Sequence, residues 1–216
     1  MSPAKDRERE RLAAIHAWRA RYDSDAAELI QDLRRAGFDV VGVGDLYNKK
    51  LSYESAIPIL VSWLPRVTNP IVKEDIARAL SVKWARNTDA PRLLVMEFER
   101  AEDATGTGLR WAIGNALEVL ANDDIADGMI RLATDRRYGK AREMVVVGLG
   151  KLKNPRVTDV LLNLLSDEEV LGHAVMALGK LRARAARSRI EHLLNHPKPW
   201  VRKEAKKALA SIDKAG

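Results

Sequence analysis

The chain has 216 residues, of which 46% are hydrophobic and 31% are charged, a balance typical of a soluble globular protein. It contains no cysteine, which excludes disulfides and thiolate chemistry. Of its net charge of +7, residues 180–207 supply ten basic against two acidic side chains, so the remainder is about neutral. Such a basic end predicts an acidic partner.

The N-terminal segment is charged from Lys5 onward and lacks the apolar core of a signal peptide. No stretch approaches the roughly 18 apolar residues of a membrane span. We therefore expect a cytoplasmic protein with no membrane partner.

Residues 1–52 are predicted to form an N-terminal helical cap. The stretch "KDRERERLAAIHAWRARY" is polar over most of its surface, which suits the end of a helical stack. We expect two helices here, over residues 5–21 and 25–36. The next segment, "FDVVGVGDLYN", reads as a loop in which Asp45 caps a brief helix. Its "GVGD" lacks the third glycine and the preceding strand of a dinucleotide site, so it is interpreted as a turn.

Residues 53–216 are predicted to form one continuous domain of helix pairs. A small residue followed by leucine recurs in "IARALSVKWAR", "IGNALEVLAND", "VVGLGKLKNP", "VMALGKLRAR" and "KKALASIDKAG". An amphipathic segment with helical spacing precedes each of them. We call the leucines of this motif the anchor leucines; they are Leu80, Leu117, Leu149, Leu178 and Leu209, separated by 37, 32, 29 and 31 positions. Because a single pair cannot bury its apolar face, about five pairs must stack to form one core.

Helix-capping and helix-breaking residues lie between these segments. Asn69 and Asn154 each precede a proline, the arrangement of a capping side chain before the first helical position. Asp89 is predicted to cap in the same way before "APRLL". The stretch "NHPKPW" at 195–200 cannot continue a helix and predicts a turn.

Two of these segments, "WVRKEAKKALASI" and "VLGHAVMALGKL", resemble the second helix of HEAT repeats of the bacterial, lyase-like type. The resemblance extends over roughly residues 53–213. It implies an all-α fold, a right-handed α-solenoid of about five HEAT-like helix pairs. It does not assign a function, because such arrays serve as scaffolds, peptide binders, nucleic-acid binders and, rarely, enzymes.

The position seven residues before each anchor leucine, here called the ladder position, is basic in four repeats of five. In HEAT families an arginine at this position commonly bonds an acidic or carbonyl group of the neighbouring repeat. The alternative is a cationic strip that holds phosphates or carboxylates of a partner. The ladder residues are Lys73, Arg110, Arg142, Leu171 and Arg202.

His173 lies five positions before its anchor leucine, where the other repeats carry Asp75, Ala112, Met144 and Glu204. Such variety argues against a shared catalytic position. We expect His173 to line the inner groove or a repeat junction. His192 and His196 have the spacing of a metal pair, but Leu193 replaces the glutamate of the zincin motif, so neither a metal site nor a cofactor is predicted.

Lysines of the last helix carry no structural role in the pattern, because Lys203, Lys206 and Lys207 fall on the solvent side of the apolar stripe. We expect them to bind an acidic partner. The full set of predicted partner-binding residues is Lys73, Arg110, Trp111, Asn115, Arg142, His173, Lys203, Lys206 and Lys207.

The function expected from the sequence is that of a non-enzymatic scaffold or adaptor. It would bind a partner protein or peptide, acidic in character, through its concave face and basic end. The alternative is a nucleic-acid-binding HEAT protein that uses phosphate contacts. At its enzymatic extreme this would be a DNA glycosylase, since HEAT-like alkylpurine glycosylases use tryptophans, an arginine and a carboxylate. No matching catalytic stretch is found here, and no catalytic residue is assigned.

Overall fold

The computed structural model describes residues 3–49, 51–103 and 108–214, and the regular elements of these residues are all helices. The chain divides into two compact units, residues 1–80 and 81–216. The domain boundary predicted from the sequence lies at residue 52 instead. The first compact unit therefore includes the first predicted helix pair.

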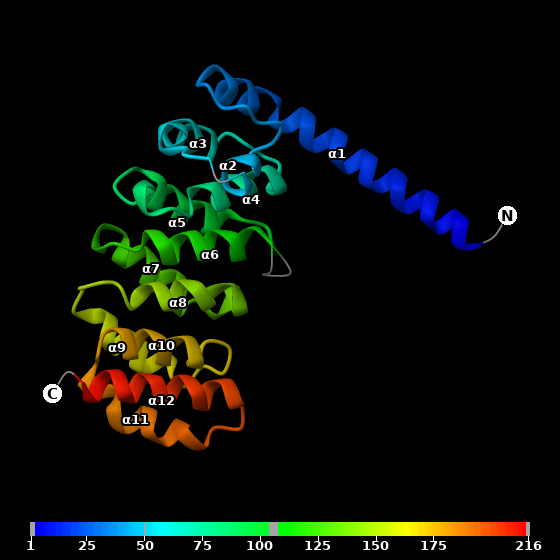
Figure 1. Cartoon of the computed structure of the whole chain (residues 1–216). Coiled ribbons are helices and arrows are strands. Elements are labelled where there is room, and N and C mark those ends of the chain that lie inside the picture. The colour runs from blue at the N-terminus through cyan, green and yellow to red at the C-terminus, as the bar shows by residue number, and fades with distance from the viewer. Residues whose placement is uncertain (1–2, 50, 104–107, 215–216) are drawn as a thin grey trace. The chain divides into compact units, whose positions relative to one another are not determined.

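The first unit is built on one long helix, α1 (Pro3–Arg35) (Figure 1). The prediction of two helices over residues 5–21 and 25–36 is wrong. The intervening residues continue the helix, since Asp23 pairs with Arg19 and Asp25 with Arg21 one turn apart. A short helix α2 (Asp45–Asn48) follows, and then the pair α3 (Ile57–Trp63) and α4 (Pro70–Leu80). Both α3 and α4 pack against α1.

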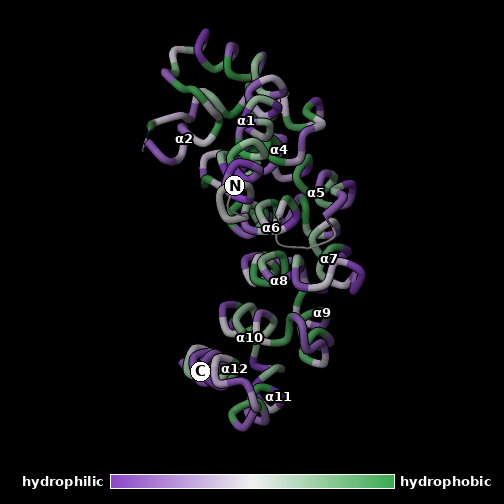
Figure 2. The backbone as a smooth tube through the Cα atoms, turned by 90° about the vertical axis from the view of Figure 1, so that its right-hand side faces the viewer, coloured by the Kyte–Doolittle hydropathy of each residue, from purple (hydrophilic) through white to green (hydrophobic). Residues whose placement is uncertain are grey.

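The described residues of the second unit form four further helix pairs. The first helices are α5 (Ala90–Arg100), α7 (Ala126–Thr134), α9 (Arg156–Leu164) and α11 (Arg187–His192). The second helices are α6 (Leu109–Leu120), α8 (Glu143–Leu149), α10 (Leu171–Lys180) and α12 (Pro199–Asp213). Each second helix contacts the next, α6 with α8, α8 with α10, and α10 with α12. The two sets form two columns in Figure 2. The predicted α-solenoid is confirmed.

Short 3-10 helices join or extend these helices. They comprise η1 (Glu54–Ala56), η2 (Lys83–Ala85), η3 (Asp123–Ile125), η4 (Arg136–Arg142), η5 (Arg184–Ala186) and η6 (Leu193–Asn195).

The core of the second unit lies between the two columns. The first four anchor leucines of the chain are completely buried, whereas Leu209 is half-buried. Among the described residues, α12 contacts α10, α11 and η6.

Small residues bring successive second helices close together. A Cβ on Gly150 would lie 2.8 Å from the Ala177 Cα, and a Cβ on Gly179 would lie 2.8 Å from the Ala208 Cα. Each of these glycines follows an anchor leucine, and each alanine precedes the next one. The small residues on either side of the anchor leucines therefore form the contact at both of these junctions.

The predicted caps are partly confirmed. The Asn69 and Asn154 side chains accept hydrogen bonds from the amides two residues on, at 2.9 and 3.0 Å. Asp89 makes no side-chain cap bond; Thr88 caps α5 instead, its hydroxyl accepting from the Ala90 amide at 3.2 Å. Asp45 is the first residue of α2, and its carboxylate accepts from the Val41 amide at 2.7 Å, so it closes the preceding turn rather than capping the helix.

Candidate functional site

The second helices of the second unit present an exposed surface, here called the second-helix face: the solvent-accessible side chains of α6, α8, α10 and α12. Three large apolar side chains on it remain exposed although the core is well packed. Trp111 of α6 and Met176 of α10 are each 38% exposed, and Trp200 of α12 is 42% exposed. Of these three, only Trp111 was predicted from the sequence to bind a partner. Met176 and Trp200 went unselected because helical spacing alone does not separate a core residue from one beside the core.

Trp200 has a defined position. Its ring lies over Gly172, where an added Cβ would come 2.0 Å from the Trp200 Cη2 atom. The same ring contacts the His173 imidazole, with ring centroids 5.3 Å apart. The tryptophan is thus held on one face by α10 and exposes the rest of its surface.

His173 joins three second helices. Its Nε2 atom lies 3.9 Å from the Glu143 carboxylate of α8, and its ring packs on Trp200 of α12. Its Nδ1 atom is buried without a hydrogen-bond partner. Burial lowers the pKa of His173, against the opposing charges of Glu143 and Glu204. The imidazole is therefore neutral at pH 7.

The ladder arginines bind backbone carbonyls. Arg110 donates to the carbonyls of Phe98, Ala101 and Asp103, at and just beyond the end of α5. Arg202 donates to the carbonyls of His196 and Pro197 at 2.7 and 2.9 Å. These carbonyls belong to the same helix pair as the arginine, which corrects the expectation of a bond to the neighbouring repeat. At α5 the arginine satisfies carbonyls that the helix end leaves without partners.

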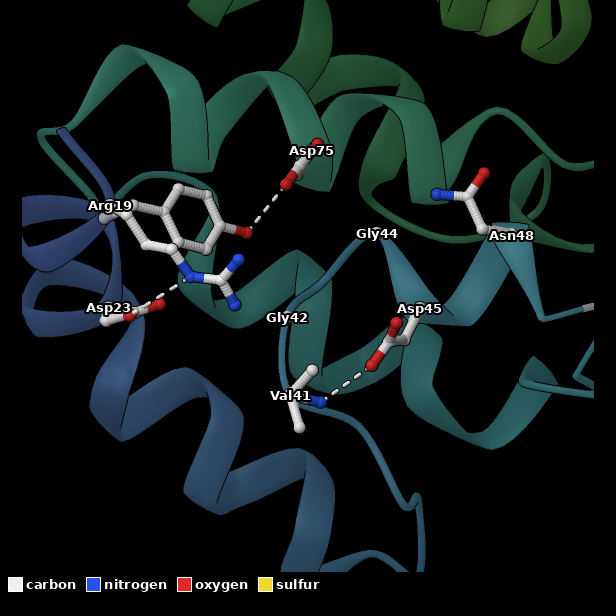
Figure 3. Close-up of a pocket in the computed structure, with 9 residues that line it drawn as sticks. Arg19, Asp23, Val41, Gly42, Gly44, Asp45, Asn48 and Asp75 are labelled. Atoms are coloured by element: carbon white, nitrogen blue, oxygen red, sulfur yellow. Dashed lines mark hydrogen bonds and ion pairs between the residues drawn. The ribbon is translucent and has the colours of Figure 1, made fainter. Parts of the chain in front are cut away.

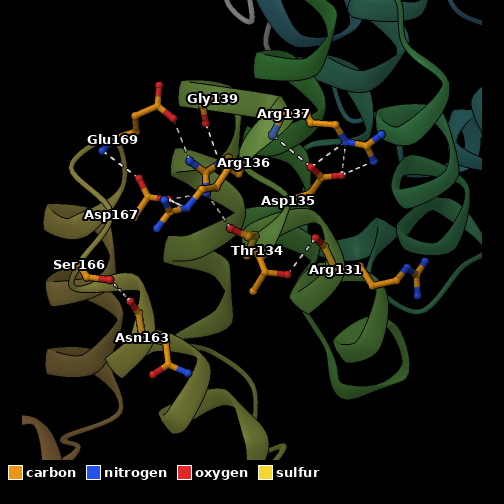
Figure 4. Close-up of polar contacts among 12 residues, drawn as sticks. Arg131, Thr134, Asp135, Arg136, Arg137, Gly139, Asn163, Ser166, Asp167 and Glu169 are labelled. Atoms are coloured by element: carbon orange, nitrogen blue, oxygen red, sulfur yellow. Dashed lines mark hydrogen bonds and ion pairs between the residues drawn. The ribbon is translucent and has the colours of Figure 1, made fainter.

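Arg142 does reach the next repeat. Its guanidinium lies 2.9 Å from Asp167 and 3.0 Å from Glu169, and it also donates to the carbonyls of Ala133 and Gly139. Figure 4 shows Asp167, Glu169 and Gly139 gathered at this junction. The Arg142 side chain is 0% exposed, so its predicted contact with a partner is corrected to a structural role. Burial acts to raise the pKa of Asp167, but the hydrogen bonds from Arg142 and the Glu169 amide lower it overall.

A pocket of about 230 Å³ lies between α10 and α12 on the second-helix face. Lys207, one of the predicted lysines, lines it and pairs with Glu204 at 2.7 Å. The other two, Lys203 and Lys206, are exposed on α12 and do not line it. The pocket is lined by Met176, Gly179, Lys180, Glu204, Lys207, Ala208 and Ser211.

The remaining predicted residues lie apart from this pocket. Asn115 of α6 donates to the Trp111 carbonyl at 2.8 Å, one turn back on the second-helix face. Lys73 is half-buried on α4 and belongs to the first unit.

The first unit holds a second pocket of about 230 Å³, lined in part by Arg19, Asp45 and Asp75 (Figure 3). The Asp75 carboxylate accepts hydrogen bonds from Tyr22 at 2.6 Å and Tyr47 at 2.8 Å. Burial, together with this carboxylate, raises the pKa of both tyrosines above the usual range. Both phenols remain protonated donors, and the network joins α1, α2 and α4.

In the described part of the chain, no three histidine or acidic side chains gather as metal ligands would. His196 accepts from the Lys198 amide at 3.2 Å, and its Nε2 atom lies 3.5 Å from Glu168. Nor does any described helix combine the length and apolar character of a membrane span.

The fold and this surface define an α-solenoid protein of helical repeats. The family model "HEAT repeats" matches residues 159–216. The fold also resembles the crystal structure of an engineered protein, with a TM-score of 0.52 and 20% identity over 75% of this chain and 81% of that one. A comparison with curated protein sequences finds no match.

Proposed function

We propose that this chain is a non-enzymatic, cytoplasmic scaffold or adaptor that binds a partner protein or peptide through its second-helix face. The observation that carries the proposal is the set of exposed apolar side chains Trp111, Met176 and Trp200 on one set of stacked helices. Exposed aromatic and methionine side chains are typical of protein-binding surfaces. The HEAT repeats support the same class, since such arrays commonly act as interaction scaffolds.

The charges of the basic end favour a protein over a nucleic acid. Many of its cations already have partners: Arg187 pairs with Asp213 at 2.9 Å, Lys198 with Glu168 at 2.9 Å, and Lys207 with Glu204 at 2.7 Å. A surface that binds nucleic acid gains affinity by neutralising successive phosphates with free cations. The carboxylates that pair with these cations lower the affinity for phosphates.

A random dodecapeptide library selected on the immobilised full chain tests the proposal. Peptides should be retained, and Met176→Glu should weaken their binding about tenfold or more by placing a charge among the apolar contacts. The introduced carboxylate would lie one turn before Lys180, so the substitution favours the helix.

The matched control is Val41→Glu, which changes an equally apolar side chain, 63% exposed, in the first unit. It should leave binding unchanged. Failure to select any peptide, or equal binding by Met176→Glu, would overturn the proposal. Binding of an oligothymidylate that weakens steeply with salt would support the nucleic-acid alternative instead.

A further inference from the structure

The pocket between α10 and α12 is lined by small residues where the two helices meet and by both apolar and charged side chains around them. Because Gly179 lacks a side chain, the two helices approach closely at Ala208, and the space above them stays open. Met176 lines it with an apolar surface, while Lys180 and Lys207 supply ammonium groups and Ser211 supplies a hydroxyl. A volume of about 230 Å³ accommodates a small group such as one side chain rather than a folded surface.

The charges beside the pocket do not balance. Glu118 of α6 accepts an ion pair from Lys151 at 2.6 Å, whereas Lys180 stands 3.8 Å from the same carboxylate. Lys151 also donates to the Glu118 backbone carbonyl, which fixes it as the nearer partner. The Glu118 carboxylate therefore interacts with two ammonium groups, and its ion pair with Lys180 is the weaker of the two.

The excess of positive charge around Lys180 affects the pKa of its ammonium group. Burial lowers the pKa of its ammonium, and the charges of Lys151 and Arg86 lower it further against the attraction of Glu118. Across the pocket, Lys207 is balanced by Glu204 at 2.7 Å. An added carboxylate at Lys180 would thus supply the counter-charge that the fold does not.

From this geometry we infer that the pocket recognises a carboxylate side chain next to an aliphatic one, as in an acidic peptide segment. The carboxylate would lie between Lys180 and Lys207, and the aliphatic group would pack on Met176. Glu118 and Glu204 would repel a continuous run of phosphates but leave room for a single carboxylate. This inference rests on the proposed function and names the chemistry of its partner.

Capped, fluorescein-labelled peptides with the cores Glu-Leu-Glu-Leu-Glu and Gln-Leu-Gln-Leu-Gln test it by anisotropy on the full chain. The glutamate peptide should bind about tenfold more tightly, as expected for a charge-assisted contact. Lys180→Gln should abolish that preference, and Lys180→Arg should retain it. Lys153→Gln, the same change at an exposed lysine outside the pocket, should have no effect.

Raising the pH gives an independent readout. The preference should fall in the parent chain as Lys180 loses its proton, at a pH below that of an ordinary lysine. In Lys180→Arg it should persist, because a guanidinium stays charged. A structural role of Lys180 alone would not produce this difference.

The outcomes separate the two proposals. Equal binding of both peptides, lost in Met176→Glu, would overturn the carboxylate site and leave the peptide-binding function standing. A preference that survives Lys180→Gln would likewise overturn the site. Binding of neither peptide, with none selected from the library, would overturn both proposals. Tighter binding of a twelve-nucleotide oligothymidylate, lost in Lys180→Gln, would make this a phosphate site and overturn the inference.

Discussion

Replacing Arg142 by methionine tests how much the contacts of this side chain between two repeats contribute to the free energy of unfolding. Methionine keeps most of the side-chain volume but removes the guanidinium that joins Asp167, Glu169 and two carbonyls. Removing one partner of a buried ion pair costs about 3–5 kcal/mol, because the remaining charge stays buried.

The lower end of this range applies. The Asp167 side chain is 7% exposed, but Arg136 remains 3.5 Å from it, and Glu169 is 46% exposed and regains water. We therefore expect the free energy of unfolding to fall by about 3 kcal/mol. Urea denaturation followed by circular dichroism measures this loss, and hydrogen exchange should localise it to residues 133–170.

Arg137→Met is the matched control, since its 84% exposed side chain pairs only locally, with Asp135. It should leave the free energy of unfolding nearly unchanged, because an ion pair in water contributes little to stability. Adding Asp167→Asn to Arg142→Met should recover about 1–2 kcal/mol, because it removes the charge that has lost its buried partner. Equal stability of the two arginine variants would refute the reasoning.

The pH dependence follows from the lowered pKa of Asp167 in the folded state. Its stabilisation is present above the unfolded value, about 3.8, and is lost as the pH falls through the folded value. The difference between the parent and Arg142→Met should therefore shrink below about pH 4.

Three further predictions concern stability. Gly172→Ala should force Trp200 off α10, costing about 1–3 kcal/mol and changing the tryptophan emission, whereas an unchanged spectrum would contradict the packing described. Folding lowers the pKa of His173, so the unfolded chain binds the proton more readily. The melting temperature should therefore drop as the pH falls below about 6.5, and His173→Phe should make it less dependent on pH. Leu149→Ala and Leu178→Ala should each cost about 2–5 kcal/mol, and Leu209→Ala clearly less; similar losses at all three would show that Leu209 is as well packed as the others.

The repeat pattern predicted the architecture because apolar spacing and small residues directly encode which faces are buried. It failed where tertiary contacts decided the outcome. The break predicted near Asp23 disappeared because Tyr22 and Ala26 continue the buried stripe of α1. The ladder position of Arg142 predicted either a bond to the neighbouring repeat or contact with a partner. It did not identify the acceptors, since Asp167 and Glu169 lie far from Arg142 in sequence.

The second-helix face was predicted less completely than the fold. Trp111 and three lysines of α12 were among the residues predicted from the sequence to bind a partner. The role that we propose for Lys180 depends on Glu118 and Lys151, which belong to two earlier repeats. Such a cluster forms only when the repeats stack.

The contacts of Gly150 with Ala177 and of Gly179 with Ala208 give this array a route to change its length. Since both junctions use the same pair of small residues at the same place in the motif, residues 150–178 begin and end with interchangeable edges. An in-frame duplication of that segment would present each neighbour with the surface it already fits. Recombination within the gene could thus lengthen the protein without inventing a new interface.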